Sequence, residues 1–170
     1  ANSPLYGKVE DFIVKDLVGH VDQKYRTVSS RSSRAVMGHS MGADGAARYS
    51  ILYPDVFCGF ASHSGSLDLS FAQLFFAFVI QEQEQQKDSI PYEYTPLDGF
   101  ATAALFRVGG AASPNLKNAP YFVDFPIDSK GKQIDSVFRK WLNLSTASII
   151  RKSPPKQNIG IFFDCGLQDE

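Results

Sequence analysis

A serine flanked by two glycines is the clearest chemical signal in this sequence. The segment Gly38-His39-Ser40-Met41-Gly42 places a glycine two residues before the serine and another two residues after it. An apolar run precedes the segment and small residues follow it, as in the strand–turn–helix motif that presents a nucleophilic serine. A serine on such a turn adopts a strained backbone conformation and projects its hydroxyl above the sheet. We predict that Ser40 is a nucleophile. A glycine-rich turn without chemistry is the alternative.

The residue after this serine has a predicted role of its own. Met41 stands at the expected start of a helix, where free amides and the helix dipole favour negative charge. In acyl transfer, negative charge develops on the carbonyl oxygen of the substrate. We therefore expect the Met41 N–H to donate a hydrogen bond to that oxyanion. The two glycines are expected to let strand and helix approach without Cβ clashes.

Strands and helices alternate around this turn. Apolar runs bounded by glycine or polar residues predict buried parallel strands at 34–38, 56–61 and 159–163. Apolar residues at helical spacing predict an amphipathic helix over 9–25. Small residues leading into an apolar stretch predict a helix over 41–53, which Pro54 ends. The order predicts an α/β fold with a mostly parallel sheet and flanking helices.

The stretch between the second and third predicted strands breaks this alternation. Residues 69–80 are strongly apolar and 81–87 are polar, which predicts a helix with one solvated end. Five prolines between 91 and 126 predict an irregular stretch, and 137–144 predicts a short helix. We interpret 67–155 as a cap or lid inserted into a single domain that spans 1–170.

Several segments resemble a known family. Val9–Leu17, Gly38–Gly42 and Tyr53–Phe57 are similar to segments of the esterase D family of α/β-hydrolases, as are Ser113–Asn115 and Tyr121–Asp124. That family includes feruloyl and acetyl-xylan esterases, S-formylglutathione hydrolases and mycolyltransferases. The resemblance implies an α/β-hydrolase fold, with the early and late core strands of the family missing from this sequence.

Two departures from the family pattern lie beside the expected site. Ala43-Asp44 replaces the usual Gly-Tyr, and His63 replaces a leucine. His39 and Asp44 are the expected substrate-binding residues. Packing in the core is the favoured alternative for His39.

The same resemblance implies an acid partner near the end of the sequence. Asp164–Glu170 is similar to the family's Asp-x-Gly-x-x-Asp segment, which makes Asp169 the expected acid and Asp164 a structural residue. The acid holds a catalytic imidazole in the right tautomer. A solvated terminal carboxylate is the alternative for Asp169.

The base that should follow this acid is missing. The fold orders its triad as serine, acid, histidine, yet the three histidines are His20, His39 and His63. His20 is expected at the surface. His63, at the end of the strand next to Ser40, is the only candidate base, with a pocket-lining or core role as its alternative. We favour a histidine on chain beyond this sequence; a base supplied by His63 and a nearly inactive polypeptide are the other possibilities. If the 170 residues are complete, unpaired sheet edges predict a homo-oligomer.

Composition excludes other classes of function. The net charge is −1 without a basic run, so no nucleic acid is expected as a partner. No apolar run approaches the roughly 20 residues that a membrane span needs, and no metal or other cofactor is expected, because no His, Asp or Glu cluster has ligand spacing. Cys58 and Cys165 are expected as buried free thiols, with one disulfide as the alternative, so the compartment stays open.

These observations lead to one expected activity and two alternatives. We expect a serine carboxylesterase that hydrolyses short-chain or aryl esters through an acyl-enzyme at Ser40. An acyltransferase would use the same acyl-serine with an alcohol acceptor. A non-catalytic α/β-hydrolase-like binding module would keep the pocket without the chemistry.

Overall fold

The computed structural model describes residues 1–85, 99–128 and 130–168, which form two compact units. One unit, here called the sheet unit, comprises Val9–Asp68 and the segment from Ser145 onwards. The other, here called the helical unit, comprises Ala1–Lys8 and Leu69–Leu144. Among the described helices, none combines the length and apolar character that crossing a bilayer requires.

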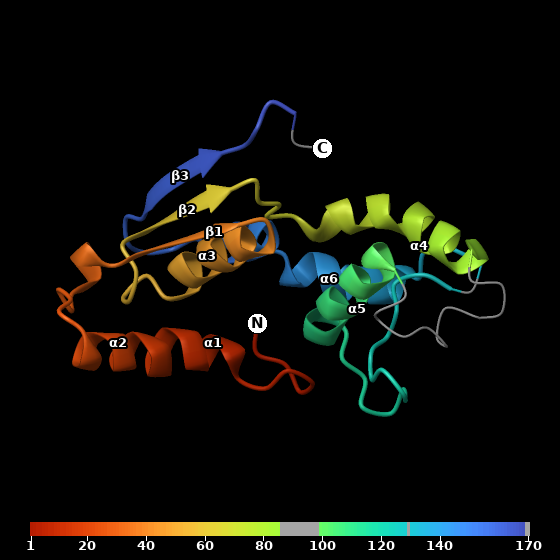
Figure 1. The fold of residues 1–170 in the computed structure, drawn as a ribbon, viewed down its shortest axis with the longest axis horizontal. Helices are drawn as coiled ribbons and strands as arrows, with labels where there is room; N and C mark the ends of the chain where they lie inside the picture. Colours follow the sequence, from red (N-terminus) through yellow and green to blue (C-terminus); the bar gives the residue numbers. More distant parts are fainter. Residues whose placement is uncertain (86–98, 129, 169–170) are drawn as a thin grey trace. The chain divides into compact units, whose positions relative to one another are not determined.

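The sheet unit is built on three parallel strands. They are β1 (Ala35–His39), β2 (Gly59–His63) and β3 (Gly160–Asp164), in that spatial order (Figure 1). The α/β class with a parallel sheet is therefore confirmed. The second strand begins three residues later than expected, because the amides of Val56 and Phe57 both bond to the carbonyl of Tyr53 and the chain is still turning there.

Helices flank this sheet. The remaining elements of the unit are α1 (Val9–Asp11), a π-helical segment (Phe12–Leu17), α2 (Val18–Lys24), a 3-10 turn (Arg31–Ser33), α3 (Met41–Leu52) and α7 (Thr146–Lys152). The first three form the helix expected over 9–25, with a π-helical middle. Arg48 of α3 makes an ion pair with the buried Glu10 of α1, and Arg34 makes one with Asp22 of α2.

One face of the sheet is packed and the other is open. Ala46, Ala47 and Ile51 of α3 form a buried cluster with Phe60 of β2. Because side chains alternate along a strand, the residues between these contact positions point the other way. On that opposite face Met37 is 76% exposed and Phe162 is 60% exposed. The carboxyl ends of all three strands meet at one edge of this half-covered sheet.

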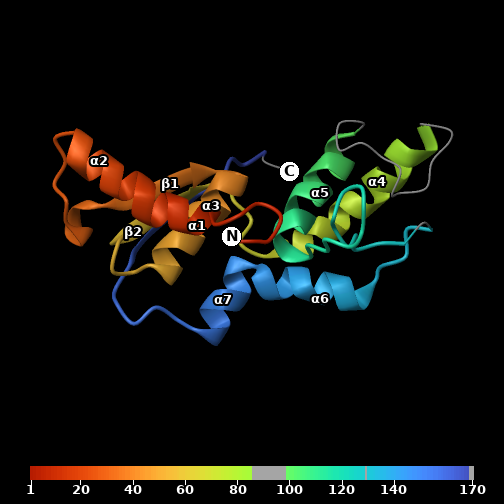
Figure 2. The same ribbon diagram turned by 90° about the horizontal axis from the view of Figure 1, so that it is seen from below.

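The helical unit packs around one tryptophan. Its elements are a 3-10 helix (Leu69–Gln73), α4 (Leu74–Gln85), α5 (Phe100–Ala112) and α6 (Asp135–Leu144), shown in Figure 2. Trp141 of α6 is fully buried with Leu105 and Phe106 of α5. The prediction of an irregular stretch was wrong over α5. No proline lies inside this helix, and its alanines and leucine favour helical backbone.

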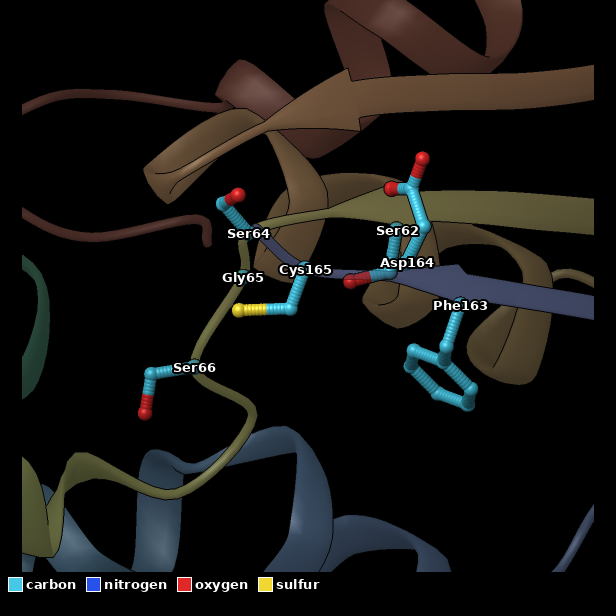
Figure 3. A pocket seen from close by; sticks show the side chains of 7 residues that line it. All are labelled: Ser62, Ser64, Gly65, Ser66, Phe163, Asp164 and Cys165. Atoms are coloured by element: carbon cyan, nitrogen blue, oxygen red, sulfur yellow. The ribbon is translucent and has the colours of Figure 1, made fainter. Parts of the chain in front are cut away.

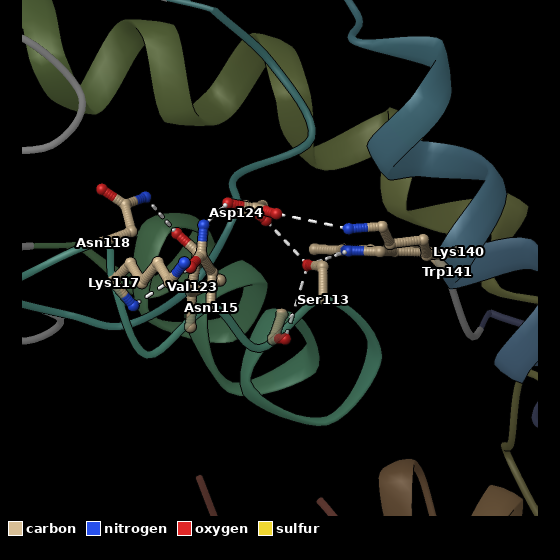
Figure 4. A network of polar contacts seen from close by, with 9 residues as sticks. Ser113, Asn115, Lys117, Asn118, Val123, Asp124, Lys140 and Trp141 are labelled. Atoms are coloured by element: carbon tan, nitrogen blue, oxygen red, sulfur yellow. Dashed lines mark hydrogen bonds and ion pairs between the residues drawn. The ribbon is translucent and has the colours of Figure 1, made fainter. Parts of the chain in front are cut away.

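Polar contacts brace the end of α5. Ser113 Oγ accepts a hydrogen bond from Trp141 Nε1 at 2.8 Å and donates one to the carbonyl of Asp124 at 2.7 Å (Figure 4). The Asp124 carboxylate accepts from Asn115 Nδ2 at 2.7 Å and pairs with Lys140 Nζ at 3.3 Å. These residues therefore tie α5, α6 and the loop between them together. Most of the segment expected as a cap, 67–155, lies in this unit, and its role as a cap stays a prediction.

Candidate active site

Ser40 occupies a sharp bend between β1 and α3. Its backbone has φ of +53° and ψ of −122°, directly after His39 ends the strand and before Met41 begins the helix. A non-glycine residue at positive φ costs about 1–3 kcal/mol and persists only where its surroundings impose it. Here the Ser40 amide donates to the carbonyl of His63 at 3.0 Å, and the Ser40 carbonyl accepts from the amide of Ala43 at 3.0 Å. Strand pairing and helix capping together hold the strained conformation, and Ser40 is exposed.

The glycine before this bend is required by a close backbone approach. A Cβ on Gly38 would lie 2.1 Å from the carbonyl oxygen of Gly42 and 2.8 Å from the amide nitrogen of Ala43. Backbone atoms cannot yield as a flexible side chain can, so any other residue would separate β1 from α3. The expectation for Gly42 was wrong, since a Cβ there would meet nothing within 4 Å.

The Met41 amide is available at the start of α3. The first amides of a helix have no partner within that helix. Among the described residues, none accepts a hydrogen bond from Met41 N–H. The Met41 side chain is exposed. An oxyanion beside Ser40 would therefore meet a free donor and the positive end of the helix dipole.

Two histidines and an aspartate form a row across the sheet edge. His39 of β1, His63 of β2 and Asp164 of β3 are register partners, so they share one face of the sheet. His63 Nδ1 pairs with Asp164 Oδ1, and the rings of the two histidines lie 5.2 Å apart between centroids. His39 is exposed, so the favoured expectation that it packs in the core was wrong. His20 is exposed on α2, as expected.

A pocket opens where β2 and β3 end. Its volume is about 500 Å³, and its lining residues are Ser62, Ser64, Gly65, Ser66, Phe163, Asp164 and Cys165 (Figure 3). The Phe163 ring and the Asp164 carboxylate point in opposite directions from the strand. Ser62 Oγ is buried without a hydrogen-bond partner. Neither Cys58 nor Cys165 forms a disulfide, but Cys165 is exposed and Cys58 only half-buried, so the expectation of buried thiols was wrong.

Asp44 lies in the first turn of α3 and is partly buried. Burial raises the pKa of its carboxyl group above the ordinary value of 3.8, against the opposing effects of the Thr146 hydroxyl and the Arg48 guanidinium. Asp44 Oδ1 and Thr146 Oγ1 are both buried without a hydrogen-bond partner. The structure therefore places one carboxylate oxygen among packed atoms rather than in the open pocket.

Sequence comparison assigns the chain to a family. A family model described as "Putative esterase" matches residues 2–170. The chain belongs to this esterase family. The resemblance noted from the motifs is thereby confirmed, and the three-stranded parallel sheet with flanking helices is part of an α/β-hydrolase-like esterase fold.

The other comparisons add little to this esterase assignment. A solved structure titled "ferulic acid esterase" matches with 16% identity and a TM-score of 0.41. That match covers 97% of this chain and 56% of the solved chain, so this sequence spans little more than half the length of that protein. The comparison with curated proteins gave no match.

Some of the predicted site residues lie together at the carboxyl edge of the sheet, and others do not. Ser40, Met41, His39 and His63 lie at the carboxyl ends of β1 and β2 or at the bend between β1 and α3. Asp169 lies outside the described residues, so its role as the acid stays a prediction. The partner of His63 is instead Asp164, which was expected to be structural. Its position as the last residue of a strand was the sequence signal, because parallel strands end at the same edge.

Within the described residues, no group of three His, Cys, Asp or Glu side chains could hold a metal ion.

Proposed function

We propose that this protein is a serine carboxylesterase that hydrolyses short-chain or aryl esters through an acyl-enzyme at Ser40. One observation carries the proposal: Ser40 has a positive φ at the junction of a parallel strand and a helix. This is the geometry of a nucleophile elbow. Membership of the esterase family supports an ester as the substrate.

The proposed reaction has two halves. Ser40 Oγ attacks the ester carbonyl carbon and gives its proton to a general base, while the Met41 N–H donates to the resulting oxyanion. The tetrahedral intermediate collapses, the carbon–oxygen bond to the alcohol breaks, and the alcohol leaves with the proton from the base. Water then attacks the acyl-serine, its proton passes to the base and then to Ser40 Oγ, and the carboxylic acid is released. The sum is ester plus water to acid plus alcohol.

The pocket supports the choice of substrate class. Phe163 offers an apolar surface, and Ser64 and Ser66 add hydroxyl groups to the lining. An aryl ring or a short acyl chain would fit an open pocket of about 500 Å³. Among the two side chains expected to contact substrate, His39 is exposed at the same sheet edge.

Labelling with a fluorophosphonate and turnover of p-nitrophenyl acetate test the proposal. Wild-type protein should be labelled at Ser40 and should release p-nitrophenol. Ser40→Ala should abolish labelling and lower turnover by roughly 10³-fold or more, since removing a nucleophile that acts with a base can cost about 10⁶. Ser136→Ala removes an exposed serine on α6 and is the matched control. Equal turnover in wild-type and Ser40→Ala proteins would refute the proposal.

A further inference from the structure

Strand β3 forms one lateral edge of the sheet (Figure 1). All five of its residues are exposed, and in the described part of the chain β2 is the only strand that pairs with it. A strand at the edge of a sheet presents a row of backbone groups with which another strand can pair. The side of β3 that faces away from β2, here called the outer side, is therefore a surface for strand addition.

The backbone groups on the outer side belong to Ile161 and Phe163. The amide of Gly160 donates at 2.8 Å to the residue that precedes β2, and the carbonyl of Asp164 accepts at 2.9 Å from the residue that follows β2. Gly160 and Asp164 therefore bond toward β2. Because successive peptide groups of a pleated strand point to opposite sides, the N–H and C=O groups of Ile161 and Phe163 point away from β2. Both residues offer a donor and an acceptor to a partner.

A second copy of the same strand matches all of these groups. In an antiparallel pair, opposite residues alternate between pairs that exchange two hydrogen bonds and pairs that exchange none. When Phe162 lies opposite Phe162 of the second copy, Ile161 lies opposite Phe163 on both sides of the two-fold axis. All outward donors and acceptors of both strands are then paired. A register shifted by two residues would leave one residue of each β3 without a partner inside the other.

The side chains of β3 suit the same register. Those of Ile161, Phe162 and Phe163 are 55% to 60% exposed, so each can bury apolar surface against a partner strand. The register places two Phe162 rings together on the open face of the sheet and Ile161 beside Phe163 on the other face. Cross-strand pairs of aromatic and β-branched side chains stabilise sheets. Asp164, the one charged residue of the strand, lies opposite Gly160, so no like charges meet.

The opposite lateral edge, formed by β1, is a poorer match. It contains no phenylalanine, tyrosine or tryptophan, and Gly38 lies in its interior, where a glycine weakens strand pairing. Soluble proteins commonly protect an exposed edge strand with lysine, proline or a bulge. The β3 sequence contains neither lysine nor proline, and its register with β2 is continuous. An edge of this composition without protection is expected where pairing belongs to the native assembly.

We propose that two copies of this chain form a closed dimer by antiparallel pairing of their β3 strands, centred on Phe162. Each copy uses the surface once, so the two-fold contact ends the assembly at two chains. The pairing joins two three-stranded sheets into one. Phe163 also lines the pocket at the end of β3, so one wall of that pocket lies at the contact. The dimer is independent of the chemistry proposed for Ser40.

Sedimentation velocity over a dilution series tests the assembly. The wild-type chain should sediment with twice the mass of one chain. Phe162→Lys places two ammonium groups against each other at the two-fold axis and should raise the dissociation constant by roughly 10²-fold or more. Met37→Lys is the matched control and should stay dimeric, because Met37 is more exposed on the same face of the sheet but lies on β1. Circular dichroism should show that both variants are folded.

Disulfide formation tests the register. Opposite residues of an antiparallel pair without mutual hydrogen bonds have Cα atoms about 4.5 Å apart, within the range that a disulfide spans. In a chain whose Cys58 and Cys165 are changed to serine, Phe162→Cys should give a covalent dimer with oxidised glutathione. Met37→Cys in the same background should remain a single chain on a non-reducing gel, because it lies two strands away from the axis.

Three results would overturn the proposal. The first is a wild-type chain that stays monomeric throughout the series; slow hydrogen exchange at the Ile161 and Phe163 amides of that monomer would show that a segment of the same polypeptide covers the strand. The second is a dimer that survives Phe162→Lys and gives no covalent product with Phe162→Cys, because its contact would lie elsewhere. The third is a series of larger particles that grow with concentration, which would show open-ended pairing.

Discussion

The polar groups of the helical unit have hydrogen-bond partners, whereas the sheet edge contains a strained serine and a buried hydroxyl without a partner. In the helical unit, the Ser113 hydroxyl both accepts and donates, and the Asp124 carboxylate has a partner at each oxygen. At the sheet edge, Ser40 is held at positive φ, and Ser62 Oγ is buried without a partner. Buried polar groups are nearly always paired in native proteins, so the second pattern is the exceptional one.

This difference separates residues that maintain the fold from residues that face a ligand. The paired network lies between elements that it must hold together, and each of its members lowers the free energy of the folded chain. The unpaired Ser62 lines an open pocket, and the strained Ser40 directly precedes a free helix amide. Strained backbone and unpaired buried hydroxyls are expected at functional sites, where chemistry rather than stability decides the structure. Their presence therefore supports a reactive role for the sheet edge.

Among the substitutions that test this comparison, Trp141→Ala should have the largest effect on stability. The substitution empties a fully buried site in the helical unit and removes the donor to Ser113, so we expect the free energy of unfolding to fall by about 3–5 kcal/mol. Urea denaturation followed by circular dichroism measures the change. A loss below about 1 kcal/mol would show that the network does not stabilise this unit.

Two buried serines give the sharpest matched pair. Ser113→Ala should cost about 1–3 kcal/mol, because it leaves Trp141 Nε1 without its acceptor. Ser62→Ala removes a hydroxyl that has no partner, so its cost should be close to zero or its effect stabilising. Both substitutions remove one oxygen from a side chain that is 1% exposed. Equal losses measured by urea denaturation would break the contrast between the two regions.

The smallest expected effect concerns Asp44. Burial raises the pKa of its carboxyl group, so the folded state binds more protons than the unfolded state between 3.8 and the higher folded value. Stability therefore falls as the pH rises through this window. Asp44→Asn removes the charge and should raise the melting temperature at pH 7, by roughly 2–4 °C for each kcal/mol gained.

The pH dependence of this last variant is its control. The difference in melting temperature between Asp44→Asn and wild type should shrink as the pH falls below 4, where the wild-type carboxyl is also neutral. A difference that is constant across this range would show that the burial of charge is not its cause.

The sequence-based predictions succeeded where nearby residues determine the local structure. They failed where the structure depends on residues far apart in the sequence. The strand before Ser40 and the helix after it were placed to within a residue, because apolar runs, small residues and a stopping proline all lie within 20 positions. Helix α5 was missed because the prolines around it were given more weight than its own composition. The core position favoured for His39 was wrong, since the face of the sheet on which it lies is open.

By itself, the sequence determined the class of the fold and the turn that carries Ser40. Apolar periodicity and glycine spacing act over a few residues, and the close approach of Gly38 to Gly42 explains why that spacing is needed. Only the tertiary structure decided which side chains meet at the sheet edge. His63 and Asp164 are 101 positions apart, and the register of two strands depends on backbone pairing and on helix packing along the whole sheet, which no short segment encodes.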